Sequence, residues 1–164
     1  MLPNCYRCHN QPCRCKDGIT LIHGDWQIME QFPDDSVDVV FTDPPYSSGA
    51  RQTAQMRSRK GLRRDEGPHG KWIGGDNLSA HGFAMMVRLF AVECFRVVRG
   101  DGHFFSFIDW RQWPVLHGSI ESSGWSARAC LVWDKIHFGM GNGFRQQCEF
   151  LLHASKGTAD NFVR

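Results

Sequence analysis

A four-residue turn carries the side chains with the clearest chemistry in the sequence: Asp43-Pro44-Pro45-Tyr46. The exocyclic amino nitrogen of a nucleobase is a poor nucleophile, because its lone pair is delocalised into the ring. A protein that activates it must hold acceptors against its hydrogens. The carboxylate of Asp43 can accept one hydrogen bond, and the carbonyl of Pro44 can accept a second. Two prolines with fixed φ keep that carbonyl rigid, so the turn has the groups needed to grip a planar amino group.

Tyr46 adds a flat aromatic face to the same turn. A base inside a duplex is out of reach of a reacting group, so it must be flipped out and retained. Stacking on an aromatic ring contributes about 1–3 kcal/mol to retention. The alternative is an ordinary turn, since Asp-Pro and Pro-Pro pairs are frequent in loops. We predict that Tyr46 stacks on a flipped base.

A second candidate site lies near the N-terminus, where four cysteines fall within eleven residues: Cys5, Cys8, Cys13 and Cys15. Four thiolates can complete a tetrahedral zinc site with bonds of about 2.3 Å. The segment cannot build a core alone, so metal binding would supply its folding energy, and His9 is a substitute ligand. The alternative is a tail with incidental cysteines. Three further cysteines are expected to be buried apolar groups: Cys94, Cys130 and Cys148.

A cluster of cations follows the turn, in a loop predicted over residues 47–79. Its basic residues are Arg51, Arg57, Arg59, Lys60, Arg63, Arg64 and Lys71, against three acidic ones, Asp65, Glu66 and Asp76. Cations beside a base-flipping turn are placed to meet DNA phosphates, which set affinity more than sequence choice. The alternative is a solvated surface. We predict DNA contacts from the arginines of this loop and Lys60.

Strands and helices must position these groups, and the apolar patterns predict them in alternation. We expect strands at 18–24, 37–42, 103–108, 127–133 and 149–154, and helices at 26–32, 80–98 (ended by Gly100) and 113–122. The alternation indicates an α/β fold with a mainly parallel sheet and flanking helices. The turn follows the strand 37–42, and ligands of such sheets gather at the carboxyl ends of strands.

Composition limits the organisation of the chain. Its 164 residues, 41% of them apolar, suffice for one sizeable core. We therefore expect a Cys-rich zinc knuckle at 1–16 and one catalytic domain at 17–164. No apolar run is long enough to cross a bilayer, and the cysteine pattern does not suit a disulfide framework. These features predict a cytoplasmic protein that does not bind membranes.

The wider string around the turn resembles the family of DNA amino-methyltransferases (DNA methylases acting on N4 or N6). The resemblance rests on Gly24-Asp25 and on the run from Phe32-Pro33-Asp34-Asp35-Ser36 through Val37-Asp38-Val39-Val40-Phe41-Thr42 to Asp43-Pro44-Pro45-Tyr46. It continues at Trp133-Asp134-Lys135, Gly139-Met140-Gly141, Arg145, Glu149 and Ser155-Lys156-Gly157, and so covers residues 18–157. It implies a Rossmann-like S-adenosylmethionine methyltransferase fold, with residues 43–46 as the catalytic and base-holding set.

The resemblance also implies roles for other residues. The motif order is that of the β class, in which Asp before Pro-Pro favours adenine as the target. Asp25 and Asp43 would contact S-adenosylmethionine, although Gly-Asp after a strand is equally typical of a helix N-cap. Lys135 and Arg145 would contact DNA. The methyl group would pass by direct displacement, without a covalent enzyme intermediate.

One expected motif is absent from the sequence. The β class carries a Phe-x-Gly-x-Gly cofactor loop, and the glycine-rich stretch starting at Phe138 places Met140 where the first glycine belongs. The stretch is better interpreted as a loop lining the base pocket. The fold is therefore expected to be incomplete, with a second chain or a missing C-terminal segment supplying the cofactor loop. The alternatives are a DNA-binding remnant, or methylation of cytosine N4, of RNA or of a protein glutamine.

Overall fold

The structure is a computed structural model that describes residues 19–47, 78–139 and 143–158. In chain order its elements are the 3-10 helix η1 (Trp26–Gln31), β1 (Val37–Thr42), α2 (Ala80–Val97), β2 (Val98–Ile108), α3 (Trp113–Glu121), β3 (Ser126–Asp134) and β4 (Cys148–Ser155). The predicted zinc knuckle and nearly all of the basic loop lie outside the described residues. Among the helices that are described, none is long and apolar enough to cross a membrane.

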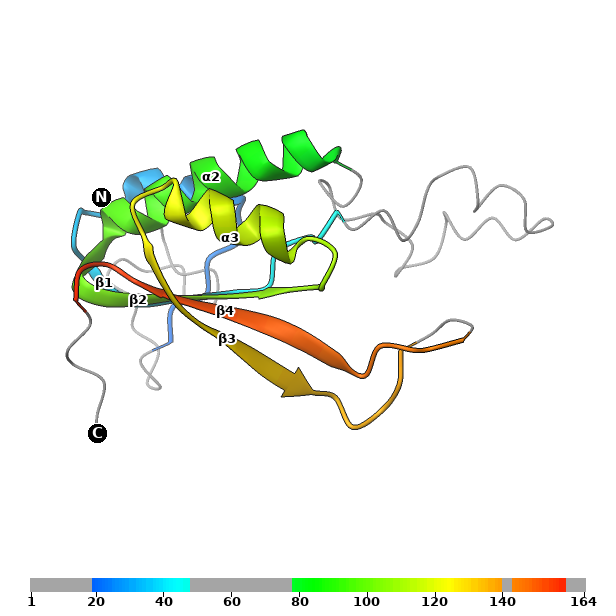
Figure 1. Ribbon diagram of the computed structural model, residues 1–164. Coiled ribbons are helices and arrows are strands. Elements are labelled where there is room, and N and C mark those ends of the chain that lie inside the picture. Colours follow the sequence, from blue (N-terminus) through cyan, green and yellow to red (C-terminus); the bar gives the residue numbers. More distant parts are fainter. Residues whose placement is uncertain (1–18, 48–77, 140–142, 159–164) are drawn as a thin grey trace.

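The four strands form one mixed sheet in the order β1-β2-β4-β3 (Figure 1). β1 pairs with β2 in parallel, whereas β4 is antiparallel to both β2 and β3. The described sheet is therefore mixed and not mainly parallel as the sequence suggested. The physical reason is that the described residues between β3 and β4 form no helix, and a short return without a crossover helix produces an antiparallel neighbour.

The helices cover one face of this sheet (Figure 1). Five residues at helical spacing form the buried side of α2: Phe83, Val87, Ala91, Cys94 and Val97. They pack in one cluster with fully buried Phe104 of β2 and Leu152 of β4. Trp125, immediately before β3, donates from its indole Nε1 to the Ala91 carbonyl at 2.9 Å, which fixes the helix against the sheet. The predicted elements at 26–32, 37–42, 80–98, 113–122, 127–133 and 149–154 are thus confirmed within a few residues.

Further sequence-based expectations are wrong. Of the three cysteines expected to be buried, Cys94 is buried, but Cys130 is exposed and Cys148 is half-buried. Residues 19–23 form no strand, and Ile19 and Leu21 are more than half exposed. The alternation of apolar residues therefore does not predict the backbone conformation here. Gly100 does not end α2: the helix stops at Val97, and Gly100 lies inside β2. Burial of Val98 in the sheet ends the helix, so tertiary packing decides the boundary.

Two cations fix the chain before β1 to the junction between α2 and β2. Lys156 Nζ donates to the carbonyls of Phe95 and Val98 at 2.8 and 2.7 Å and to Asp35 Oδ1 at 2.8 Å. Arg96 donates to the carbonyls of Met29 and Phe32, both at 2.9 Å. Helix η1 and the turn that starts β1 are therefore held against the buried end of α2.

The opposite face of the sheet carries no described helix (Figure 1). Large apolar side chains lie exposed on it or beside it: Val39, Phe41, Leu131 and Trp133, with exposed fractions of 45%, 63%, 43% and 55%. β1 was expected to be buried in a sheet, but among the described residues it is an edge strand with a half-exposed pattern. This side is called the open face below, meaning Val39, Phe41, Phe105, Leu131 and Trp133.

Truncating the centre of the core should destabilise the chain. Phe104→Ala removes a ring with no solvent exposure and should lower the free energy of unfolding by about 3–5 kcal/mol. Phe144→Ala removes a fully exposed ring and should change it by less than about 0.5 kcal/mol. Urea denaturation followed by tryptophan fluorescence measures both. Similar losses for the two variants would contradict the packing described here.

Candidate active site

The turn 43–46 begins where the ladder between β1 and β2 ends. The last paired residue is Thr42, opposite Ser106, and the two prolines that follow Asp43 have no N–H to continue the ladder. Ser47 then takes a left-handed conformation with φ 48°, which is uncommon for a residue with a side chain. The chain therefore leaves the sheet in a sharp bend, with residues 43–46 projecting from the carboxyl end of β1.

The side chains at the two ends of the turn are joined. The Tyr46 hydroxyl donates to Asp43 Oδ1 at 2.6 Å. Burial raises the pKa of Tyr46, and the bond to Asp43 raises the same pKa further, because ionisation would remove the donor and place two anions together. The phenol therefore stays protonated at neutral pH. A carboxylate has two oxygens and about four lone-pair sites, so one bond from Tyr46 leaves it capable of accepting others.

Carboxylates from neighbouring strands surround Tyr46. Asp109 follows β2 and Glu149 lies near the start of β4, and both, like Asp43, raise the pKa of Tyr46 through their negative charge. Glu149 is paired with Lys135, whose Nζ lies 2.7 Å from its Oε1. Asp109 Oδ1 accepts from the backbone N–H groups of Arg111 and Gln112. The site is thus rich in acceptors, which suits a ligand with amino hydrogens.

A buried hydrogen bond ties the turn to the next strand connection. Gln112 Nε2 donates to the Ser47 carbonyl at 2.7 Å, and both residues are buried. Gln112 precedes the first residue of α3, and the carboxylate of Asp109 fixes its backbone. The uncommon φ of Ser47 is thereby held from outside the turn. The bond couples the position of Tyr46 to α3.

A cavity of about 240 Å³ lies behind the turn, on the helix-covered face of the sheet. Its walls come from η1, β1, the turn, α2, β2 and α3: Trp26, Thr42, Asp43, Pro44, Pro45, Met86, Val87, Phe90, Phe104, Ser106 and Leu116. Apolar side chains dominate this lining, and Asp43 is the one carboxylate in it. An apolar pocket with a few polar groups at one end is the usual form of a small-ligand site.

The structure brings together only part of the predicted site. Asp43, Pro44 and Pro45 line the cavity, and Tyr46 is half-buried beside it. Asp25 is exposed and occupies the N-cap position of η1, although its side chain makes no capping bond. Trp26 after it lines the cavity. Arg145 lies over the Phe138 ring at 5.2 Å.

Other predicted site residues lie outside the described part of the chain. These are the six loop cations predicted to contact DNA, Arg51, Arg57, Arg59, Lys60, Arg63 and Arg64, and the four predicted zinc ligands, Cys5, Cys8, Cys13 and Cys15. Among the described residues, no group of three or more His, Cys, Asp or Glu side chains could hold a metal ion. The zinc site stays a prediction.

Sequence reasoning did not single out Asp109 or Gln112. The signal was present, because both follow a predicted strand at its carboxyl end, where ligands of open α/β sheets gather. Applying that rule to β2 as well as to β1 would have found Asp109. The bond from Gln112 to Ser47 joins residues 65 positions apart, so no local pattern could reveal it.

A family model described as DNA methylase, of the N6/N4 methyltransferases, matches residues 37–163. The chain belongs to this DNA methylase family. The matched stretch starts at β1 and includes the turn 43–46 and every described element after it. The resemblance seen in the sequence is therefore confirmed at the level of the family.

Proteins described as methylases are similar to this chain. The candidate methylase YubD of Escherichia coli (strain K12) is 28% identical over 134 residues, which are 80% of this chain and 50% of YubD. A candidate DNA modification methylase of Thermus thermophilus, solved with S-adenosyl-L-methionine, aligns with a TM-score of 0.56 and 15% identity, over 85% of this chain and 53% of its own.

The PvuII DNA methyltransferase, specific for cytosine N4, aligns with a TM-score of 0.53 and 18% identity, over 82% of this chain and 48% of its own. These likenesses confirm the Rossmann-like methyltransferase fold, in an incomplete form. The chain spans about half the length of the relatives that it matches.

Removing the Gln112 side chain should loosen the turn. Gln112→Ala leaves the Ser47 carbonyl buried without its donor and should lower the free energy of unfolding by about 1–3 kcal/mol. Gln146→Ala is the matched control, because its Nε2 also donates to a backbone carbonyl, that of Cys148, but in an exposed place. The control should stay within about 0.5 kcal/mol of the unchanged chain in urea denaturation. Equal effects would show that the bond to Ser47 does not brace the turn.

Proposed function

We propose that this chain carries the base-holding part of an S-adenosylmethionine-dependent DNA methyltransferase that modifies the exocyclic amino group of a flipped adenine. The observation that supports this most strongly is the geometry of the turn 43–46. It projects an acceptor-rich, aromatic site from the carboxyl end of β1, and it lies within the part of the chain that matches the DNA methylase family.

Asp43 and the Pro44 carbonyl are proposed to accept the two amino hydrogens of the base, which draws the nitrogen toward a tetrahedral, nucleophilic form. Tyr46 stacks on the base. In the absence of a base, the Tyr46 hydroxyl occupies Asp43 Oδ1, so the acceptor is held in place before the base arrives. The entering amino group then either shares Asp43 Oδ1 with the Tyr46 hydroxyl or displaces the hydroxyl from it. Acceptors positioned in advance need little reorganisation during reaction.

The proposed cofactor fits the described residues only in part. S-adenosylmethionine supplies an electrophilic methyl group, and its ribose hydroxyls and charged amino-acid end need polar partners. The cavity beside the turn offers Thr42, Asp43 and Ser106 among mainly apolar walls, and exposed Asp25 directly precedes Trp26 of its lining. These residues suit one side of the donor but do not enclose it. We propose that Asp25 and Asp43 contact the donor, and that further residues complete its site.

The outer edge of β1, whose last residue Thr42 lines the cavity, and the open face suggest where an additional polypeptide joins the sheet. The exposed apolar side chains of the open face, and the outer edge of β1, resemble the unfinished side of a larger core, because monomers rarely leave such patches in water. The relatives of this chain are about twice as long as the part that it matches. We propose that an additional polypeptide, a second chain or a C-terminal segment, covers the open face and brings the cofactor loop.

DNA is the proposed substrate, and adenine the proposed base. The support for adenine is Asp at position 43, which the β-class resemblance associates with that base. One structural relative acts on cytosine N4 by its name, so cytosine is the second candidate. Lys135, a predicted DNA contact, forms an ion pair with Glu149 beside Tyr46. This pairing favours a role for Lys135 in neutralising the negative charge of the site. Arg145 is exposed and remains a proposed DNA contact.

Methyl transfer to unmethylated DNA tests the proposed function. The full chain is incubated with tritiated S-adenosylmethionine in large excess, and the DNA is digested to nucleosides for mass spectrometry. We expect label in N6-methyladenine. Label in N4-methylcytosine would support the second candidate. Because the donor is in large excess, its weak binding is overcome, and the absence of label from every nucleoside would contradict the proposed methyltransferase function.

Substitutions in the turn should separate the role of Asp43, which holds the amino group, from that of Tyr46, which stacks on the base. Asp43→Ala should lower transfer by at least about 10²-fold at saturating DNA, beyond its loss of affinity for the extruded base, because it removes an acceptor and no stacking surface. Tyr46→Ala should weaken DNA binding by roughly 5- to 100-fold through lost stacking and should lower transfer as well. Tyr46→Phe keeps the ring and should retain transfer within about tenfold. Equal, small effects of all three changes would count against the assignment.

Calorimetry with S-adenosylmethionine tests the need for an additional polypeptide. Because the described cavity suits one side of the donor, we expect the chain alone to bind weakly, with a Kd in the millimolar range, worth about 4 kcal/mol. Micromolar binding, worth about 8 kcal/mol, would contradict the proposal that another polypeptide completes the donor site.

A further inference from the structure

The connection between β2 and α3, residues 109–112, is held rigidly beside the turn. Asp109 Oδ1 accepts from the backbone N–H groups of Arg111 at 3.0 Å and Gln112 at 3.1 Å. Gln112 Nε2 then donates to the Ser47 carbonyl. The two residues between these anchors, Trp110 and Arg111, are therefore presented in a fixed place next to Tyr46.

Trp110 is 53% exposed, although it lies on this rigid connection. The guanidinium carbon of Arg111 lies 4.9 Å from the centroid of the Trp110 ring, and the Arg111 side chain is also half exposed. Trp113, three residues later, is instead packed against Phe150 with their ring centroids 5.9 Å apart. Because the fold packs Trp113 close by, it does not force Trp110 to be exposed. An exposed tryptophan such as Trp110 is typical of a binding residue.

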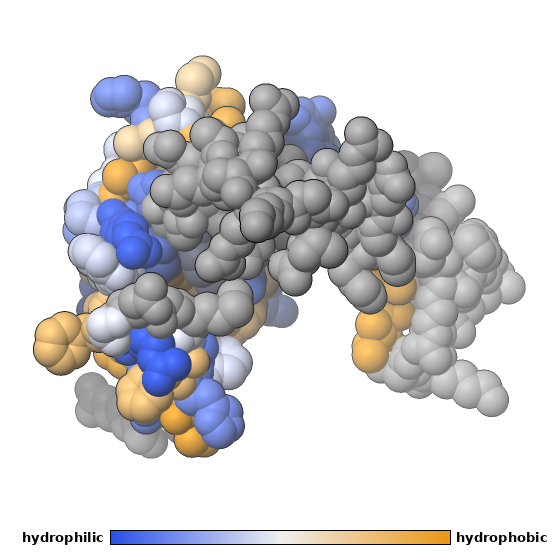
Figure 2. Space-filling view, turned by 90° about the vertical axis from the view of Figure 1, so that its right-hand side faces the viewer, coloured by the Kyte–Doolittle hydropathy of each residue, from blue (hydrophilic) through white to orange (hydrophobic). Residues whose placement is uncertain are grey.

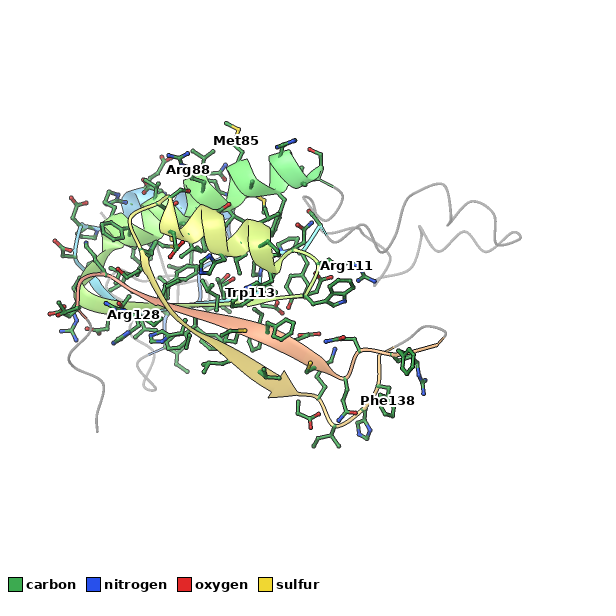
Figure 3. All side chains as sticks on the ribbon, in the orientation of Figure 1. Met85, Arg88, Arg111, Trp113, Arg128 and Phe138 are labelled. Atoms are coloured by element: carbon green, nitrogen blue, oxygen red, sulfur yellow. The ribbon has the colours of Figure 1, made fainter. Side chains whose placement is uncertain are left out.

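A second pair of the same kind lies on the connection between β3 and β4. The guanidinium carbon of Arg145 lies 5.2 Å from the Phe138 ring centroid, and Phe138 is 60% exposed. Arg111 and Phe138 lie at the same end of the molecule (Figure 3). Tyr46, Trp110 and Phe138 follow the carboxyl ends of β1, β2 and β3; β1 and β2 are neighbours in the sheet, whereas β4 lies between β2 and β3.

This combination of groups suits an unpaired nucleic-acid strand. Aromatic rings stack on successive bases, and guanidinium groups bind phosphates and stack on the same rings. Neighbouring strands lie about 4.8 Å apart, so Tyr46 and Trp110 leave the sheet within reach of adjacent nucleotides. Figure 2 views this end of the molecule, where hydrophobic and hydrophilic residues lie next to one another outside the grey atoms.

We propose that Trp110 stacks on the nucleotide base next to the flipped one and that Arg111 contacts the phosphate between them. Phe138 and Arg145 hold a further nucleotide of the same strand. The proposal rests on the proposed function, because it presumes a nucleic-acid substrate, and it adds the neighbouring nucleotides as bound groups. Stacking accepts any base, so these contacts contribute affinity and positioning, not sequence choice.

Fluorescence anisotropy on the full chain tests the proposal with two labelled probes of equal length, an oligodeoxyadenylate and a strand of abasic residues. Trp110→Ala should weaken binding of oligodeoxyadenylate by roughly 5- to 100-fold and leave binding of the abasic strand unchanged. Trp110→Phe should restore most of the affinity. Arg111→Ala should weaken both probes and lower the salt dependence by about one phosphate contact.

Matched controls lie on the far side of the helices. Met85→Ala and Arg88→Ala change an exposed apolar residue and an exposed cation of α2, and neither should alter binding (Figure 3). In a chain that already carries Asp43→Ala, Trp110→Ala should weaken binding by the same factor. This separates stacking by Trp110 from the chemistry at Asp43. Unchanged binding of oligodeoxyadenylate by Trp110→Ala, or an equal loss on both probes, would overturn the proposal and would show that Trp110 serves the fold or a protein partner. If the unchanged chain bound neither probe, the proposed contacts to neighbouring nucleotides would be overturned, whereas methyl transfer to unmethylated DNA tests the proposed function separately.

Discussion

The parallel pairing of β1 with β2 determines where the chemistry of this chain can lie. β2 is the central scaffold: Phe104, Ser106 and Ile108 are buried under the helices, and β4 pairs along its other edge. β1 is held in register with it up to Thr42, and the prolines after Asp43 make further pairing impossible. The turn must therefore leave the sheet at its carboxyl end, next to the residues that follow β2. The candidate site is a consequence of this pairing and of where the prolines fall.

The charges around the turn are consistent with an amino group as ligand. Asp43 accepts from the half-buried phenol of Tyr46, and the negative charges of Asp109 and Glu149 also raise its pKa. Glu149 is paired with Lys135, and Asp109 with Arg111. Such a surface attracts hydrogen-bond donors and repels phosphates. The exposed arginines that accompany Trp110 and Phe138 lie on the connections around it. The phosphates of a bound nucleic acid would thus contact the arginines, and its extruded base would contact the hydrogen-bond acceptors.

Sequence patterns predicted correctly those helices and strands in which apolar residues are concentrated or recur at regular spacing. The stripe of α2 and the apolar run of β1 repeat with the periods of a helix and a strand, and both lie where they were predicted. Gly100 failed as a helix end, because burial of Val98 in β2 outweighs the preference of glycine for helix termini. The segment 19–23 alternates as a strand would but forms none, because alternation over five residues is a weak signal. Residues 43–46 were predictable from a contiguous motif, whereas the contacts of Gln112 and Asp109 join distant segments.

The central claim is that Asp43 holds the amino group of an extruded base, and a double-mutant cycle between the protein and DNA tests it most directly. Affinity is measured for two oligonucleotides that carry adenine, or purine without its amino group, opposite an abasic site. The unchanged chain should bind the adenine strand more tightly by about 10- to 150-fold, and Asp43→Ala should bind both alike, because a hydrogen bond to a charged acceptor contributes about 1.5–3 kcal/mol. Equal affinities in the unchanged chain, or a preference that survives Asp43→Ala, would contradict the claim.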